Sequence, residues 1–206
     1  MAAHSTDQFT KPKSDTRLAG VLLCVSGITF FVFNHIAESI YPNYSVSKNY
    51  LSDLGATGQR TTLLWDPLLF VTGVLWLLGM YFFLRRSGRG KLTLALYILA
   101  PFGQITVSLF PENTVLAIHT VGALIAFILG GVSALFTYRL TRSPFRYFSV
   151  LLGAVALASL VFFVSGHDLG LGVGGMERMI VYPMTLWLIM LGGYLMATVD
   201  EKQAQA

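Results

Sequence analysis

The stretch LAGVLLCVSGITFFVFNHIAESIY, residues 18–41, decides the fold. It is a long apolar run in which Glu38 is the only acidic residue. A helix needs about 20 mostly apolar residues to cross the hydrocarbon core of a bilayer, and this run satisfies that requirement. It is too long for a signal-peptide core, and no A-x-A cleavage pattern follows it. The run therefore predicts a retained membrane-spanning helix.

The composition of the whole chain agrees with a membrane environment. Of the 206 residues, 54% are hydrophobic and 12% are charged, whereas soluble domains carry about 25% charged residues. The net charge of +4 does not indicate a nucleic-acid-binding protein, because the basic residues are dispersed over short segments between apolar runs. The single cysteine, Cys24, excludes an intrachain disulfide.

Five further apolar segments resemble the first. The six runs together are 18–41, 63–85, 92–110, 118–138, 147–165 and 178–198. We therefore predict an all-α membrane protein, a six-transmembrane helix bundle that forms one domain over residues 18–198. Residues 1–17 are predicted to be a disordered cytoplasmic tail, and residues 199–206 a second cytoplasmic tail.

The basic residues predict how the bundle is oriented. Of the 14 Lys and Arg residues, all but Lys48, Arg60 and Arg178 lie in the tails and in the second and fourth connections. Because Lys and Arg accumulate on the cytoplasmic side, both termini are predicted to be cytoplasmic, in the cell membrane. An even number of spans is required for this orientation, and six satisfies it.

The groups capable of chemistry gather on the opposite, extracytoplasmic side. Three of the four histidines, His35, His119 and His167, are predicted there, together with the acidic residue Glu112. The two internal cytoplasmic connections, RRSGRGK and YRLTRSPFR, contain no His, Asp or Glu. Ionisable groups near membrane depth are costly unless they are paired or face a cavity. The asymmetry therefore predicts a polar pocket at the outer ends of the first, fourth and sixth spans.

Three short motifs in this outer region resemble those of a known family. The motifs are YLSDLG (50–55), LFPENTVLAIH (109–119) and GLGVGGMER (170–178). In this order they are similar to the multipass membrane proteins called domain of unknown function 998. The resemblance implies a six-span bundle and no particular activity. The family pattern falls on Ser52, Asp53, Gly55, Pro111, His119, Glu177 and Arg178.

The first functional hypothesis is a lipid-directed hydrolase or transferase. Its candidate catalytic residues are Ser52, Asp53, His119, Glu177 and Arg178. Catalytic zinc typically has three protein ligands and a water, and His35, His119 and Asp53 are candidate ligands, with Glu38 or His167 as alternatives to Asp53. A metal-free version uses Ser52 as nucleophile and His119 as base. In either version Arg178 would bind a phosphate or carboxylate head group.

Two other hypotheses need no catalysis. In a lipid-binding or scaffold protein the same polar groups hold the outer helix ends together, with Arg178 paired to Asp53 or Glu177 and with Ser52 and Asp53 ordering a turn. A small transporter would need ionisable residues at mid-depth, and no series of carboxylates is visible there. The expected partners are membrane lipids in each case, and the sequence alone does not separate an enzyme from a binding protein.

Overall fold

The computed structural model describes residues 13–85 and 91–204. Residues 1–12 of the predicted N-terminal tail and the basic segment 86–90 lie outside the described residues. The regular structure in the described part is helical, as predicted. The elements are α1 (Lys13–Ile40), η1 (Ser52–Gly55), α2 (Thr62–Leu84), α3 (Lys91–Leu109), α4 (Leu116–Phe136), η2 (Thr137–Arg139), α5 (Phe145–Val164) and α6 (Gly172–Ala204).

The six long helices coincide with the six predicted apolar runs, and the main differences are at the ends of the first and last. Helix α1 begins at Lys13, inside the predicted tail, where Asp15 pairs with Arg85 at the end of α2. Helix α6 begins at Gly172 and continues to Ala204. Glu177 and Arg178 consequently lie inside α6 rather than at its start, so neither is placed to interact with a helix N-terminus.

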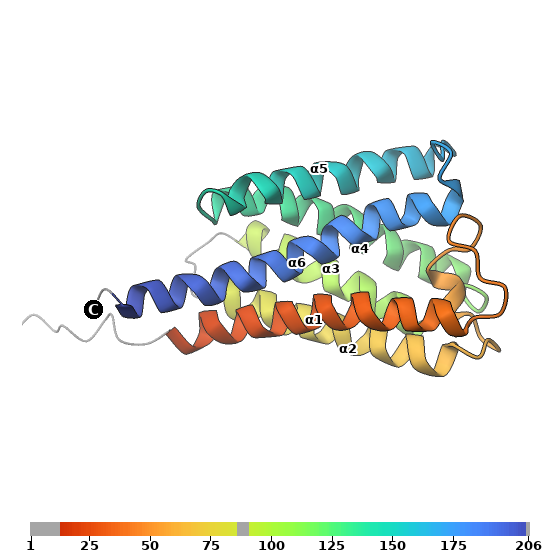
Figure 1. Cartoon of the computed structure of the whole chain (residues 1–206), viewed down its shortest axis with the longest axis horizontal. Coiled ribbons are helices and arrows are strands. Elements are labelled where there is room, and N and C mark those ends of the chain that lie inside the picture. Colours follow the sequence, from red (N-terminus) through yellow and green to blue (C-terminus); the bar gives the residue numbers. More distant parts are fainter. Residues whose placement is uncertain (1–12, 86–90, 205–206) are drawn as a thin grey trace, which may run out of the picture.

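The helices form a ring in which each packs on the next in chain order, and α6 also packs on α1. They run roughly along the long axis of the molecule (Figure 1). Three connections, residues 41–61, 110–115 and 165–171, meet at one end, which we call the loop end. The C-terminal end of α6 lies at the opposite end (Figure 1).

Small residues allow these helices to approach closely. A Cβ atom at Gly192 of α6 would lie 2.5 Å from the carbonyl oxygen of Gly20 in α1, and one at Gly103 of α3 would lie 2.5 Å from that of Gly122 in α4. Close backbone contact of this kind is typical of helix pairs in membranes. Larger side chains, including Trp76 of α2 and Trp187 of α6, fill the interior.

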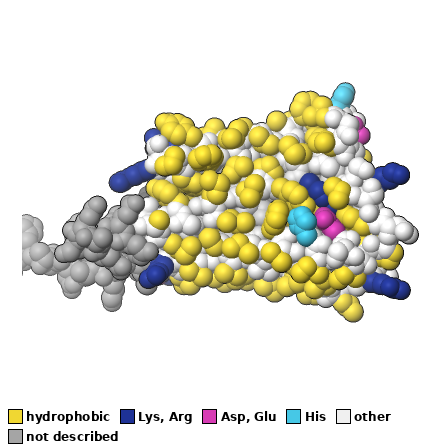
Figure 2. Space-filling view, viewed as in Figure 1, with side chains coloured by type: hydrophobic (Ala, Val, Ile, Leu, Met, Phe, Trp, Pro, Cys, Tyr) yellow, Lys and Arg dark blue, Asp and Glu magenta, His cyan; other side chains and the backbone are white. Residues whose placement is uncertain are grey.

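The outer surface of the bundle is apolar. Large side chains such as Val32, Leu151 and Val161 are 52%, 57% and 67% exposed, and hydrophobic side chains cover most of the face between the two ends in Figure 2. Soluble proteins rarely expose contiguous apolar surface on this scale. Among the described residues, five helices are long and apolar enough to cross a membrane, and the apolar part of α3, Leu94–Leu109, is shorter. The chain is therefore a multipass integral membrane protein.

Candidate functional site

The first connection, residues 41–61, folds across the loop end and is ordered by Asp53. The Asp53 carboxylate accepts hydrogen bonds from the Asn49 side-chain amide, at 2.8 Å, and from the backbone N–H of Tyr50, at 3.0 Å. Short polar side chains commonly organise turns in this way. Asp53 therefore orders the loop and does not pair with Arg178, which was one of the predicted partners.

Two glycines of α6 let this loop rest on the first turn of the helix. Gly172 has φ of +74°, a backbone conformation that favours glycine. A Cβ atom there would collide with the carbonyl oxygen of Ser47, and a Cβ atom at Gly174 would collide with those of Val46 and Asn49. The glycine-rich motif thus supplies close packing between loop and helix.

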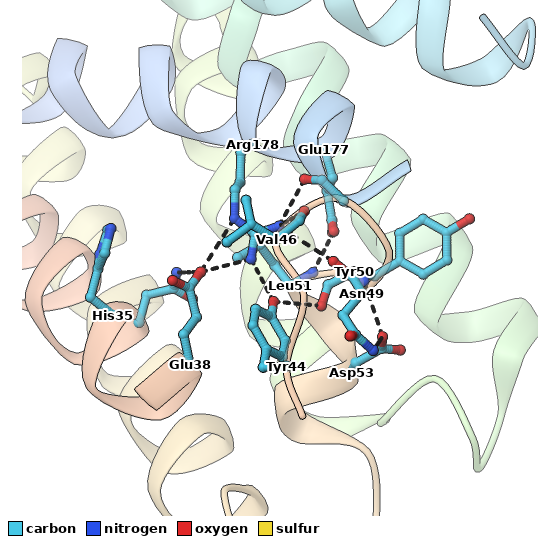
Figure 3. A network of polar contacts seen from close by, with 12 residues as sticks. His35, Glu38, Tyr44, Val46, Asn49, Tyr50, Leu51, Asp53, Glu177 and Arg178 are labelled. Carbon is cyan, nitrogen blue, oxygen red and sulfur yellow. Dashed lines mark hydrogen bonds and ion pairs between the residues drawn. The ribbon is translucent and has the colours of Figure 1, made fainter. Parts of the chain in front are cut away.

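Arg178 joins this loop to two helices. Its guanidinium group donates hydrogen bonds to the Glu38 carboxylate of α1 at 2.7 Å, to the Tyr44 hydroxyl at 2.5 Å and to the Gly174 carbonyl at 2.8 Å. A further contact reaches the Val46 carbonyl at 3.3 Å. Figure 3 shows the side chains converging between α1, the loop and α6. The Arg178 and Glu38 side chains are only 6% and 12% exposed, so this ion pair is largely desolvated.

The network continues from Glu38 into the bundle. The Asn34 amide donates to Glu38 at 3.1 Å, and the indole N–H of Trp65 in α2 donates to the Asn34 oxygen at 3.1 Å. The Tyr44 hydroxyl donates to the Tyr50 carbonyl at 3.0 Å, and burial raises the pKa of Tyr44, which keeps that hydroxyl protonated. We call Asn34, Glu38, Tyr44 and Arg178 the Arg178 cluster. Its members are bonded to one another or to backbone groups.

A cavity lies inside the helix ring, beneath the loop end. It offers about 70 Å³ to water-sized molecules, enough for several waters or a slim apolar group. Three of the predicted catalytic residues, Ser52, His119 and Glu177, contribute to its wall. We call this cavity the Ser52 pocket; it is lined by Phe30, Leu51, Ser52, Trp65, Leu69, Trp76, Gln104, Val107, His119, Ala123, Ala126, Phe127, Glu177, Val181 and Met184.

Glu177 and Arg178 are adjacent in sequence but serve different parts of this region. Successive residues of an α-helix point about 100° apart. Arg178 therefore reaches α1 and the loop, while Glu177 lines the pocket and accepts a hydrogen bond from the backbone N–H of Leu51 at 2.5 Å. Glu177 is only 7% exposed, and this bond fixes the loop residue next to Ser52.

Ser52 is bonded to a carboxylate that the sequence analysis did not include among the catalytic candidates. Its hydroxyl donates to Glu112, in the connection between α3 and α4, at 2.5 Å. Burial, and then the neighbouring Asp53 carboxyl, raise the pKa of Glu112 to about 7. A carboxylate with such a pKa, in contact with a hydroxyl, is suited to remove its proton near neutral pH. The sequence signals for Glu112 were its predicted place on the extracytoplasmic side and its position in the motif LFPENTVLAIH.

His119 lies at the start of α4, and one of its ring nitrogens is already committed. Its Nδ1 lies 2.9 Å from the carbonyl oxygen of Phe110. Because a carbonyl only accepts hydrogen bonds, Nδ1 carries the proton. In the neutral ring Nε2 is then a hydrogen-bond acceptor, on a buried side chain that lines the pocket.

The other two histidines of the described residues, His35 and His167, do not line this pocket. His35 is exposed on α1, where its Nδ1 contacts the Phe31 carbonyl at 2.8 Å and its ring stacks on Tyr182. His167 is exposed in the α5–α6 connection and contacts Ser165. Figure 2 shows a small group of His, acidic and basic side chains that interrupts the apolar surface near the loop end.

The predicted zinc site of His35, His119 and Asp53 has no counterpart in the described residues. Across residues 13–85 and 91–204, no three His, Cys, Asp or Glu side chains lie together in a way that could hold a metal ion. The physical reason is helix rotation: residues three apart on α1 differ by about 60° in direction. That difference turns Glu38 towards Arg178 and leaves His35 on the outer surface.

Comparisons with curated proteins and with solved structures give no match. A comparison with family models gives one, described as "Protein of unknown function (DUF998)", over residues 19–194. This range contains all the members of the Arg178 cluster and of the Ser52 pocket, and it confirms the resemblance carried by the three motifs. The chain therefore belongs to the DUF998 family of membrane proteins.

Proposed function

We propose that all six long helices cross the cell membrane, with both termini in the cytoplasm and the loop end on the extracytoplasmic side. Helix α3 has 19 residues, which gives a length of about 28 Å at 1.5 Å per residue, close to the roughly 30 Å of a hydrocarbon core. It packs between α2 and α4, which are both long enough to span. The distribution of Lys and Arg supports the orientation.

We further propose that the Ser52 pocket hydrolyses lipid esters, or transfers their acyl group, without a metal ion. The observation that carries this proposal is the hydrogen bond of 2.5 Å to Glu112 from Ser52, a residue that lines a mostly apolar cavity. A nucleophile within hydrogen-bond reach of a base, the base being tuned by its surroundings, is the general arrangement for covalent catalysis. His119 and Glu177 add two polar groups to the same wall.

The proposed reaction has two balanced steps. In the first, Ser52 Oγ attacks the ester carbonyl carbon and gives its proton to Glu112. The carbon–oxygen bond to the leaving group breaks, and Glu112 returns the proton to the departing alkoxide. In the second, Glu112 removes a proton from water, the resulting hydroxide attacks the acyl-serine, and the proton passes back to Ser52. His119 Nε2, as an acceptor, orients that water.

The lining of the pocket supports a lipid ester as the substrate class. A cavity with many apolar and few polar groups favours a ligand that is mostly hydrocarbon with one reactive polar group. Phe30, Leu69, Phe127 and Val181 provide such walls on four different helices. An acyl ester drawn from the surrounding lipid fits this description, and an alcohol in place of water in the second step would make the same site a transferase.

The test is Ser52→Ala in purified protein reconstituted into lipid nanodiscs, with release of fatty acid from a monoacylglycerol as the readout. We expect hydrolysis by the unaltered protein and a loss of roughly 10³-fold or more in Ser52→Ala, because the nucleophile is removed. Ser47→Ala is the matched control, since this exposed hydroxyl of the same loop contacts only Ser45. Absence of hydrolysis by the unaltered protein, or full activity of Ser52→Ala, would refute the proposal.

The second candidate is a non-enzymatic lipid-binding or scaffold protein, and the Arg178 cluster favours it. Its polar groups are bonded to one another and to the loop backbone, which is what a structural plug requires. On this alternative Ser52→Ala would lower the melting temperature and no hydrolysis would be seen in any variant. Measuring melting temperature beside fatty-acid release separates the two functions.

A further inference from the structure

An apolar groove runs along the outside of the bundle between α2 and α3. It offers about 640 Å³ to water-sized molecules, and all the residues that line it are aliphatic or aromatic. Helix α2 contributes Leu78 and Tyr81, and α3 contributes Leu94, Ala95 and Phe102. Water in an apolar groove on a membrane-facing surface would have no polar partner. Hydrocarbon is therefore the occupant that fits these walls.

The length of the groove matches one hydrocarbon chain within a leaflet. Along α3 the walls extend from Leu94 to Phe102, which is eight helical positions, or roughly 12 Å at 1.5 Å per residue. One leaflet contributes about 15 Å, half of a hydrocarbon core that is about 30 Å thick. The groove shares no lining residue with the Ser52 pocket, so a chain bound here is not in contact with the reactive groups.

A cationic side chain lies at the end of the groove that is opposite the loop end. Arg85 follows Tyr81 by one helical turn and so continues the same face of α2. Its guanidinium carbon lies 5.8 Å from the centroid of the Tyr81 ring, which lines the groove. The Arg85 side chain is 30% exposed. A ligand whose hydrocarbon chain occupied the groove would therefore have its polar end beside this cation.

Arg85 keeps hydrogen-bonding capacity beyond its ion pair with Asp15. The bonds to Asp15 use Nε, at 3.1 Å, and Nη2. A guanidinium group has five N–H donors on three nitrogens, so this pair leaves Nη1 for a second acceptor. Asp15 is the less exposed member of the pair, at 14%. The planar donor group of arginine is well suited to a phosphate.

The charge at this end of the bundle favours an anionic ligand. From Arg85 to Lys91 the sequence has four basic residues and no acidic one, so the pairing of Arg85 with Asp15 leaves an excess of positive charge. Basic residues beside a membrane span attract lipids with anionic head groups. Charge and hydrocarbon lining together describe an anionic phospholipid.

We propose that this groove binds an anionic phospholipid, with one acyl chain between α2 and α3 and the phosphate group at Arg85. The groove supplies a contact that is the same for every phospholipid with that chain. Arg85 supplies the preference for a net negative head group. The proposed orientation enters only in assigning the bound lipid to the cytoplasmic leaflet, and the proposed hydrolysis does not enter at all.

The experiment measures lipid binding by native mass spectrometry of the full-length protein released from detergent micelles. The probes are dioleoyl phosphatidylglycerol, which is anionic, and dioleoyl phosphatidylcholine, which has the same chains and no net charge. We expect the anionic probe to bind about fivefold more tightly, the contribution of one basic group near a membrane surface. Arg85→Gln should abolish this preference. Arg142→Gln, which removes an exposed arginine of the α4–α5 connection, should retain it.

A second pair of variants tests the groove itself. Ala95 is an exposed residue of the lining, and Ala95→Trp should fill the groove and remove most of the binding of both probes. Ala154→Trp places the same side chain on the exposed surface of α5 and should leave the binding of both probes unchanged.

The double variant Asp15→Asn, Arg85→Gln separates the loss of the cation from repulsion by the remaining carboxylate. Because it removes both charges, the preference should stay abolished, whereas Asp15→Asn alone should retain it. Equal binding of the two probes by the unaltered protein, a preference that survives Arg85→Gln or returns in the double variant, or undiminished binding to Ala95→Trp would each overturn the inference. If Arg85→Gln does not fold, Ala95→Trp decides, since an exposed alanine tolerates the change.

Discussion

The Arg178 cluster and the Ser52 pocket lie side by side at the loop end, and they use polar groups in opposite ways. In the cluster, Arg178, Glu38 and Tyr44 are bonded to one another and to backbone carbonyl groups. In the pocket wall, His119 bonds Phe110 through one ring nitrogen and its second nitrogen is an acceptor, and Ser52 is bonded to the titratable carboxyl group of Glu112.

This difference distinguishes a cluster that stabilises the fold from a pocket that is available to a ligand. A buried ion pair whose groups are bonded to one another and to backbone carbonyl groups holds helices together. A cavity wall that retains free donor and acceptor positions is available to a ligand. Because Glu177 and Arg178 are neighbours in the sequence, the boundary between the two regions passes between adjacent residues of α6.

The largest effect is expected from Arg178→Met, which tests the structural side of the comparison. The substitution leaves the Glu38 carboxylate buried without its cation, and removal of one partner from a buried pair costs about 3–5 kcal/mol. We expect a loss of this size in the free energy of unfolding, measured by denaturation in mixed micelles. Adding Glu38→Gln should restore part of the loss, because the isolated charge is then removed.

Arg60→Met is the matched control for that measurement. Arg60 is an exposed residue of the same loop, and surface substitutions usually change stability by less than about 0.5 kcal/mol. If Arg178→Met lowered the free energy of unfolding as little as Arg60→Met, the Arg178 cluster would not stabilise the fold. Its contrast with the Ser52 pocket would then be wrong.

The next effect is expected from Gly174→Ala, where the loop rests on α6. An added Cβ would collide with the carbonyl oxygens of Val46 and Asn49, which are backbone atoms that move with the whole loop. Overpacking of this kind costs about 1–3 kcal/mol. Gly193→Ala in the same helix is the control, since its Cβ would meet nothing within 4 Å. That variant should unfold no more easily than the unaltered protein, because alanine favours helix more than glycine does.

The sequence predicted most of the helical elements because hydrophobic runs extend over whole helices. The apolar runs located all six long helices, and the outer motifs located Ser52, His119 and Glu177 in one pocket. The predictions that failed concern the direction in which individual side chains point. His35 and Glu38 were both candidate zinc ligands, yet a difference of about 60° around α1 puts them in different environments.

Glu112 was missed for another reason. It contacts Ser52 across 60 positions of sequence, and no local pattern reveals which outer carboxylate a loop will meet. Arg178 was predicted to pair with Asp53 or Glu177, but the true partner is Glu38, at the end of a different helix. Partner choice among several acids at one end of a bundle is decided by helix packing, which the sequence does not display directly.

The most specific effect concerns the pH dependence that Glu112 is expected to give to hydrolysis at the Ser52 pocket. Its pKa is raised from 4.5 to about 7, first by burial and then by Asp53. Because the raised pKa favours the protonated carboxyl in the folded protein, its contribution to stability is complete below pH 4.5 and is lost as the pH rises through 7. The base is needed in its charged form, so activity should change in the opposite direction.

Hydrolysis should therefore fall about tenfold for each pH unit below 7, measured as fatty-acid release per unit of folded protein. The Glu112→Gln variant should hydrolyse the ester slowly at every pH. Its free energy of unfolding should not decrease between pH 4.5 and 7, as that of the unaltered protein should. Asp168→Asn is the control, because Asp168 is an exposed carboxylate at the same end that contacts only the Gly170 backbone. If the decrease in hydrolysis below pH 7 persisted in Glu112→Gln, the base would be a different group, and His119 of the pocket wall would be the residue to substitute.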